Sequence, residues 1–172
     1  CRRQRQMCIR DRMGSARPEA RRSDIKTLRL SAVVARWNSD ITGGLLSGAL
    51  RTCISQGLDK DQVSVFYVPG AFELALGVQQ AIRTGQFDGV IALGSVIRGD
   101  TPHFDYVCAE TTRGIGQVVL EESVPVGFGL LTTDTHDQAV FRSIENDSNK
   151  GEEAALAVLE MINTLRLIWN RR

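Results

Sequence analysis

The residue types that could do chemistry gather most densely in residues 94–103, which read GSVIRGDTPH. Two glycines bracket an expected strand end, and Asp100 and Thr101 stand shortly before His103 at an expected helix start. Free backbone N–H groups at such a helix start form a site for an anion such as phosphate. The glycines are not followed by the lysine of a Walker loop. Because an imidazole beside an anion site is suited to proton transfer near neutral pH, we favour a catalytic His103 over a structural one.

Four other side chains have both a structural and a functional interpretation, and the residue pattern leaves these open. Trp37 ends an apolar run, so it could pack in the core or present a flat platform to a heteroaromatic ring. Glu73 follows a Pro-Gly turn and could stabilise a helix start or accept hydrogen bonds from ligand hydroxyls. Arg142 and Lys150 could be exposed charges or could complete a phosphate site. The residue types together indicate ligands that are aromatic, hydroxylated and phosphate-bearing.

Alternating strands and helices must position these side chains. Apolar runs predict strands over residues 28–37, 63–68, 89–96 and 124–131. Helical spacing predicts one helix that Asp40 caps and Gly57 ends, and further helices over 72–84, 104–122 and 135–143. A last helix is expected to start near Asn149, with Glu152 as its capping-box partner. Such alternation predicts a three-layer α/β/α sandwich with a four-stranded parallel sheet. Ligands bind beyond the carboxyl ends of such strands, where residues 36–38, 69–73, 94–103 and 128–134 fall.

The charge distribution divides the chain of 172 residues into two parts. Residues 1–26 carry nine Lys/Arg against three acids, whereas residues 27–172 carry twelve against seventeen. We therefore expect residues 1–26 to be a disordered tail and residues 27–172 to be a single domain. The first twelve residues resemble a translated sequencing adapter, so we expect the native start at Met13 or later. The acidic balance of the domain argues against nucleic acid as a partner.

The composition argues against a membrane protein, a metal-binding protein and a disulfide-linked protein. No apolar run approaches the roughly 20 residues that span a bilayer, and the N-terminus has no secretory signal pattern. The four cysteines form no C-x-x-C pair and only two histidines are present, so we predict no metal site. We interpret Cys53 and Cys108 as small buried thiols and expect a cytoplasmic protein.

Five motifs in order along the chain resemble the lumazine synthase family. They are ARWN (35–38), VPGAFEL (68–74), ALGSVIRGDTPHFDYV (92–107), FGLLTTDTHDQA (128–139) and NKGEEAA (149–155). The resemblance implies a flavodoxin-like strand order and condensation of 5-amino-6-(D-ribitylamino)uracil with 3,4-dihydroxy-2-butanone 4-phosphate. The products are 6,7-dimethyl-8-ribityllumazine, phosphate and water, made in riboflavin biosynthesis without a cofactor.

The resemblance also implies a role for each matching position. Trp37 would stack on the pyrimidine, and His103 would be the proton donor. The other substrate-binding positions are Ala71, Phe72 and Glu73 for the ribityl chain, Ser95, Val96 and Ile97 for the pyrimidine, and Asp100, Thr101 and Arg142 for the phosphate. Phe128, Lys150 and Glu153 would reach the site from the neighbouring subunit.

A site shared between subunits requires assembly, and the family resemblance implies pentamers, some of which build sixty-subunit shells. Residues 142–150, RSIENDSNK, have the length found in shell-forming members, but Glu, Asn, Asp and Ser replace their glycines. We therefore expect a pentamer or a pair of pentamers.

Three other functions fit some features of the sequence, but each fits less well than a lumazine synthase. A non-catalytic flavin-binding or cage-forming relative would lack His103 or Arg142, and both are present. A flavodoxin-like electron carrier needs a first strand–helix loop that binds phosphate, and residues 38–43 fit that role poorly. Nucleic-acid binding would depend on the basic tail, whose first twelve residues we suspect to be artefactual.

Overall fold

Four parallel strands form the centre of the molecule, in the order β2-β1-β3-β4. The computed structural model describes residues 25–170. The strands are β1 (Leu30–Ala35), β2 (Val63–Val68), β3 (Gly89–Ile97) and β4 (Val126–Thr133). This confirms the α/β class, the four-stranded parallel sheet and its flavodoxin-like order. The expected start at Met13 and most of the expected tail fall on residues outside the described ones. Ile25, the second-last residue of that expected tail, is buried in a core cluster, so the packed domain includes it.

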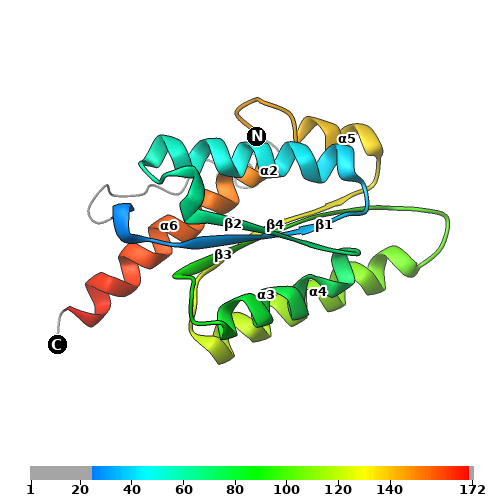
Figure 1. Cartoon of the computed structure of the whole chain (residues 1–172). Helices are drawn as coiled ribbons and strands as arrows, with labels where there is room; N and C mark the ends of the chain where they lie inside the picture. The colour runs from blue at the N-terminus through cyan, green and yellow to red at the C-terminus, as the bar shows by residue number, and fades with distance from the viewer. Residues whose placement is uncertain (1–24, 171–172) are drawn as a thin grey trace, which may run out of the picture.

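Helices cover both faces of the sheet, so the predicted three layers are confirmed (Figure 1). The α-helices are α2 (Ser39–Gln56), α3 (Leu74–Arg83), α4 (His103–Glu122), α5 (His136–Phe141) and α6 (Lys150–Trp169). Three short 3₁₀ segments are η2 (Ile25–Thr27), η3 (Lys60–Gln62) and η4 (Ala71–Glu73). One core cluster lies between the sheet and α2 and α6, and the other lies between the sheet and α3 and α4. Among the described helices, none is long and apolar enough to cross a membrane.

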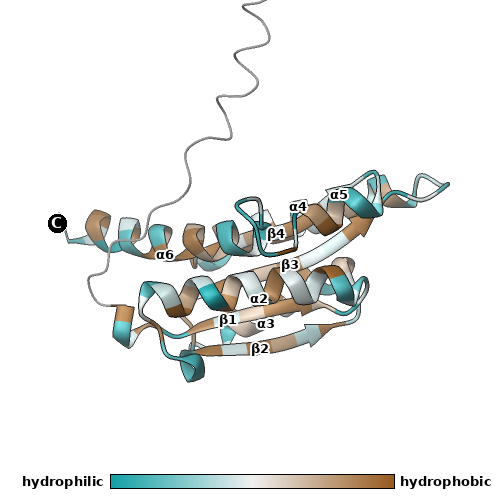
Figure 2. Ribbon diagram, turned by 90° about the horizontal axis from the view of Figure 1, so that it is seen from above, coloured by the Kyte–Doolittle hydropathy of each residue, from teal (hydrophilic) through white to brown (hydrophobic). Residues whose placement is uncertain are grey.

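The burial of the strands explains why the sheet could be predicted. All six residues of β1 and the first seven of β3 are buried, as expected for strands that helices cover on both faces. Figure 2 shows that much of both strands is hydrophobic. The edge strands differ, since Phe66 and Tyr67 on β2 and Phe128 on β4 are exposed. Exposed aromatic side chains on edge strands indicate surfaces that another molecule can cover.

The helices α2 and α6 lie side by side on one face of the sheet (Figure 2). Asn149, at the start of α6, holds their junction together. A Cβ atom on Gly151 would collide with the carbonyl of Leu45, so glycine permits this close approach. Asn149 is 1% exposed, and its Oδ1 accepts hydrogen bonds from the Gly151 N–H (2.9 Å) and the Glu152 N–H (3.2 Å). Its Nδ2 donates to three backbone carbonyls, those of Gly44, Ser143 and Ile144. The predicted cap at Asn149 is thereby confirmed.

Several predicted helix and strand boundaries were wrong. The strand expected over 28–37 spans Leu30–Ala35, and the helix expected over 135–143 spans His136–Phe141. Helix α2 begins at Ser39 with Asn38, not Asp40, as its cap residue, because Asn38 adopts the left-handed conformation (φ 57°) that asparagine tolerates. Strand β4 starts at Val126 and runs to Thr133, because Pro125 has no N–H to donate and β3 continues to Ile97. The helix expected over 72–84 is divided into η4 and α3.

The predicted capping box at α6 was also wrong. The Glu152 carboxylate does not reach back to its cap, because it accepts a hydrogen bond from the Arg51 guanidinium of α2 (2.8 Å). The stop of α2 at Gly57 was right, since Gly57 is left-handed (φ 110°) and caps the helix.

Cys53 is a buried thiol, as predicted, whereas Cys108 is only half-buried. Burial raises the pKa of Cys53 from its ordinary 9.0 to about 11. The protonated thiol is therefore favoured in the folded state, and its contribution to stability is complete below pH 9 and lost as the pH rises to about 11.

When the pH rises from 8.5 to 11, the free energy of unfolding of Cys53→Ala should fall less than that of the native chain. The difference should be roughly 1–3 kcal/mol, because each unit of pKa shift corresponds to about 1.4 kcal/mol. Urea denaturation at several pH values measures this difference. Parallel pH dependences for the two chains would show that the Cys53 thiol is not responsible.

Candidate active site

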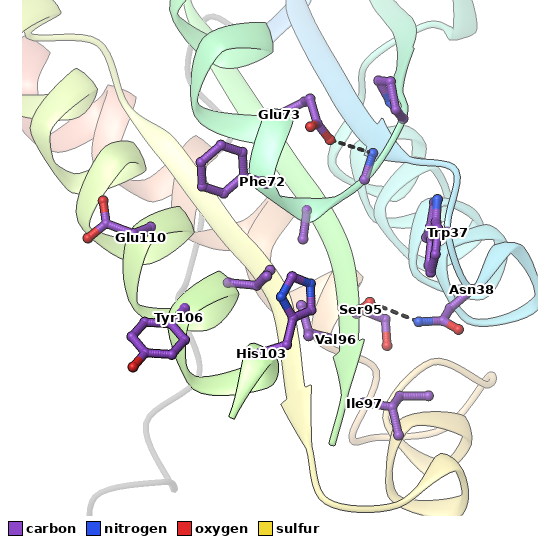
Figure 3. A pocket seen from close by; sticks show the side chains of 14 residues that line it. Trp37, Asn38, Phe72, Glu73, Ser95, Val96, Ile97, His103, Tyr106 and Glu110 are labelled. Carbon is purple, nitrogen blue, oxygen red and sulfur yellow. Dashed lines mark hydrogen bonds between the residues drawn. The ribbon is translucent and has the colours of Figure 1, made fainter. Parts of the chain in front are cut away.

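A cavity of about 730 Å³ opens at the carboxyl ends of β1, β2 and β3, beside η4 and α4. Figure 3 shows its labelled side chains, with Trp37 projecting from the end of β1 and His103 from the start of α4. Eight predicted site residues line it: Trp37, Ala71, Phe72, Glu73, Ser95, Val96, Ile97 and His103. Its wall is mostly apolar with a few polar groups, which is typical of small-molecule sites.

The end of β1 presents an exposed indole to this cavity. Trp37 is 75% exposed, so its interpretation as a core residue is wrong. The next residue, Asn38, donates a hydrogen bond from Nδ2 to the Ser95 carbonyl (3.0 Å), which ties the ends of β1 and β3 together. The left-handed backbone of Asn38 turns the chain sharply between Trp37 and α2. The indole face is therefore available to stack on a flat ring.

Glu73 closes the turn that follows β2. Its Oε2 accepts a hydrogen bond from the Gly70 N–H (2.9 Å), as the dashed line in Figure 3 marks. The Thr111 hydroxyl of α4 donates to the Ala71 carbonyl (3.1 Å) and anchors η4 from the other side. Glu73 therefore has a structural role, and its carboxylate also lines the cavity, where it can accept hydrogen bonds from ligand hydroxyls.

The face of α4 that begins at His103 forms one wall of the cavity. Tyr106, Val107 and Glu110 follow His103 at the spacing i+3, i+4 and i+7 and line the same cavity. Hydrogen bonds from Arg113 lower the pKa of Glu110, so this carboxylate stays ionised. These three residues were not predicted as site residues, although helical periodicity counted from His103 would have found them.

Asp100 and Thr101 lie on the loop between β3 and α4 and do not line either cavity described here. Both are exposed, and they stand three and two residues before His103. Pro102 occupies the cap position of α4 and supplies no side-chain acceptor to the first turn. No side chain therefore caps the first turn of α4, and Thr101 supplies an exposed hydroxyl beside it, features that an anion site can use.

Arg142, Phe128 and Lys150 line a second cavity of about 240 Å³ beside β4 and α5. Arg142 donates from Nη1 to the Gln138 carbonyl (2.9 Å), and Lys150 pairs with Glu153 (2.7 Å). Within the described part of the chain, the two cavities share no lining residue. The structure thus places eight predicted site residues in one cavity and three in another, whereas Asp100, Thr101 and Glu153 line neither.

The described residues contain no cluster of three or more His, Cys, Asp and Glu side chains that could hold a metal ion.

The Ser95 hydroxyl lies at the wall of the larger cavity. It is buried and has no hydrogen-bond partner among the described residues. Unpaired buried polar groups are costly and are concentrated at functional sites.

Comparison with known proteins decides the family. The model of the 6,7-dimethyl-8-ribityllumazine synthase family matches residues 27–166. The chain belongs to this family. One curated relative, the 6,7-dimethyl-8-ribityllumazine synthase of Desulfovibrio desulfuricans (strain ATCC 27774 / DSM 6949 / MB), is 46% identical over 153 residues. That match covers 89% of this chain and 98% of the relative.

Membership of the lumazine synthase family gives the reaction class. The chain is a transferase that makes 6,7-dimethyl-8-ribityllumazine in riboflavin biosynthesis, as the resemblance of its motifs implied. Two small-molecule substrates and an oligomeric enzyme follow from the family.

Proposed function

We propose that this chain condenses 5-amino-6-(D-ribitylamino)uracil with 3,4-dihydroxy-2-butanone 4-phosphate at a site between two subunits. The larger cavity of one subunit would be completed by Phe128, Arg142, Lys150 and Glu153 of the next. The observation that supports this most strongly is the division of the matching residues between two cavities with no common wall. The 45% exposure of the Phe128 side chain on edge strand β4 also favours a neighbouring subunit there.

The larger cavity suits the pyrimidine substrate. Its exposed Trp37 face can stack on the ring, and the backbone of Ser95–Ile97 can hydrogen-bond the ring edges. Glu73, which already holds the turn at Gly70, can accept hydrogen bonds from the ribityl hydroxyls. The volume of about 730 Å³ is within the usual range for a small-molecule site.

The loop before α4 suits the phosphate of the second substrate. Asp100 and Thr101 lie on this loop, and Thr101 offers a hydroxyl in addition to the free N–H groups at the helix start. Asp100 carries a negative charge, so its part would be played by its backbone N–H. Arg142 of the neighbouring subunit would add a bidentate guanidinium, the cation whose geometry best fits a phosphate.

His103 would move the protons of the reaction. Attack of the arylamine on the ketone forms an imine and releases water, and loss of phosphate breaks a C–O bond. Ring closure then joins the second amine to the remaining carbonyl and releases another water. Each step needs a proton taken from nitrogen or carbon and one given to a leaving oxygen, which an imidazole at the cavity wall can supply. Holding the two substrates together contributes the rest, since well-oriented pairs gain up to about 7–11 kcal/mol.

A fluorescence assay with both substrates tests this proposal. We expect lumazine formation above the spontaneous rate and saturation with each substrate. His103→Ala should lower kcat about 10²-fold, near the lower end of general acid–base effects, and leave both KM values within a factor of about 3. His136→Ala is the matched control, because His136 pairs with Asp40 outside both cavities. An unchanged kcat for His103→Ala would remove this residue from the mechanism.

The assembly proposed for this site is a pentamer or a pair of pentamers in the cytoplasm. The loop between α5 and α6 is folded onto its own subunit, since Asn146 donates to the Phe141 carbonyl (2.8 Å) and Glu145 pairs with Arg51 (3.7 Å). Glu, Asn, Asp and Ser stand in this loop where shell-forming members have glycines, which favours the pentamer over a larger shell. Light scattering should give about 95 kDa or twice that value, from 18.9 kDa per chain. A particle near a megadalton would contradict this expectation.

A further inference from the structure

Arg98, the residue after β3, contacts side chains from two different parts of the chain. Its Nε donates to Asp134 just after β4 (2.8 Å), and its Nη1 pairs with Asp105 in the first turn of α4 (3.1 Å). The guanidinium carbon also lies 4.2 Å from the centre of the Phe104 ring, which is buried. One cation therefore joins the end of β3, the start of α4 and the turn after β4.

The first consequence concerns the loop over residues 99–102. Arg98 stands before this loop and Asp105 stands after it, so their ion pair closes the loop on itself. The stacking of the guanidinium on Phe104 fixes the residue that directly follows His103. Both the proposed phosphate loop and the imidazole are thus held by contacts of Arg98.

The second consequence concerns the side that carries Arg142. The backbone N–H of Asp134 donates to the Gln138 side-chain oxygen (3.0 Å), and Arg142 donates from Nη1 to the Gln138 carbonyl (2.9 Å). Arg98 also donates its own N–H to the Thr133 carbonyl (2.9 Å). A continuous set of hydrogen bonds therefore runs from Arg98 through Asp134 and Gln138 to Arg142.

We propose that Arg98 is a positioning residue for the phosphate-bearing substrate, which fixes the loop before His103 and the turn that leads to Arg142. This rests on the proposed function, because it assumes that both elements bind the phosphate. Arg98, Asp105 and Asp134 are 43%, 59% and 69% exposed. Because ion pairs this exposed contribute little to stability, the function of the arrangement is geometric.

Four full-length variants test the proposal: Arg98→Gln, Arg98→Lys, Asp134→Asn and Arg83→Gln. Arg98→Gln removes the cation, and Arg98→Lys keeps the charge without the planar fork that reaches two carboxylates. Asp134→Asn breaks the contact from the other side without altering Arg98. Arg83→Gln is the matched control, because the exposed Arg83 forms an ion pair with the half-buried Glu122 (2.7 Å) and lines neither cavity.

The readouts are kcat, KM for each substrate, the inhibition constant of inorganic phosphate and the thermal unfolding midpoint. We expect Arg98→Gln to raise KM for the phosphate-bearing substrate and the phosphate inhibition constant about 10-fold to 100-fold, the cost of small misplacements. Asp134→Asn should shift both constants in the same direction, and Arg98→Lys should fall between native chain and Arg98→Gln. KM for the pyrimidine, the unfolding midpoint and every property of Arg83→Gln should stay near the native values.

Two results would overturn the positioning role. One is a phosphate inhibition constant and a KM within twofold of native in both Arg98→Gln and Asp134→Asn. The other is an equal rise of both substrate KM values together with a lower unfolding midpoint, which would mark a merely structural residue. Failure of the proposed function is distinguishable, because the native chain itself would then make no lumazine above the spontaneous rate.

Discussion

Arg142→Ala should reduce kcat/KM for 3,4-dihydroxy-2-butanone 4-phosphate by about 10²-fold to 10⁴-fold. A hydrogen bond to a charged group contributes about 1.5–3 kcal/mol, and a bidentate guanidinium makes two such bonds to a phosphate. Each 1.4 kcal/mol is a factor of ten in the rate constant. The Arg142 guanidinium donates to the Gln138 carbonyl, and the backbone hydrogen bonds of Arg142 do not depend on its side chain, so the change removes little that stabilises the fold. Steady-state rates with each substrate varied in turn measure the effect.

The effect of Arg142→Ala should be confined to one substrate. KM for the pyrimidine should change less than threefold, because the residues proposed to hold the ring line the other cavity. Arg142→Lys should recover part of the loss, since it restores the charge without the bidentate geometry. Equal weakening of both substrates would contradict the assignment of Arg142 to the phosphate.

Asn149→Ala should lower the free energy of unfolding by about 3–5 kcal/mol, the largest loss that we expect from one side chain. The substitution removes a helix cap, which costs about 1–2 kcal/mol. It also leaves buried backbone carbonyls without their donor, at about 1–3 kcal/mol for each unsatisfied group. The junction between α2 and α6 is affected directly, because Asn149 also contacts the Gly44 carbonyl of α2. Urea denaturation followed by circular dichroism measures the loss.

Thr135→Ala is the matched control for this prediction. Thr135 caps α5 through a hydrogen bond from the Gln138 N–H (3.2 Å), but it is exposed and makes no comparable bridge between helices. We expect this control to cost about 1 kcal/mol. A loss of the same size in both variants would show that Asn149 acts as an ordinary cap and not as the junction of two helices.

Much of the fold could be predicted because β1 and β3 are nearly continuous apolar runs and the helices carry clear start or stop residues. The boundaries that failed depended on contacts between distant segments. Asn38, not Asp40, precedes α2 because its side chain is fixed by the Ser95 carbonyl, 57 residues away. Glu152 left its expected capping box because Arg51 of α2 lies within 2.8 Å. Local patterns carry no information about such partners.

The candidate site could likewise be predicted only in part from the sequence. His103, Glu73 and residues 95–97 could be assigned to one cavity from the rule that ligands bind at the carboxyl ends of parallel strands. The rule did not indicate that Arg142 and Lys150 line a separate cavity, because that depends on how β4 and α5 pack at the edge of the sheet. The contacts of Arg98 were equally inaccessible, since Asp134 lies 36 residues away along the chain.

Mixed assemblies of two inactive variants test the divided site most directly. His103→Ala and Arg142→Ala chains, with different affinity tags and co-expressed in equal amounts, would be purified as assemblies that contain both. If each site combines the cavity of one subunit with Arg142 of the next, about one quarter of the sites in a random ring contain both intact residues. We expect lumazine formation at about one quarter of the native rate, far above either parent. Activity equal to the mean of the two parents would contradict a site shared between subunits.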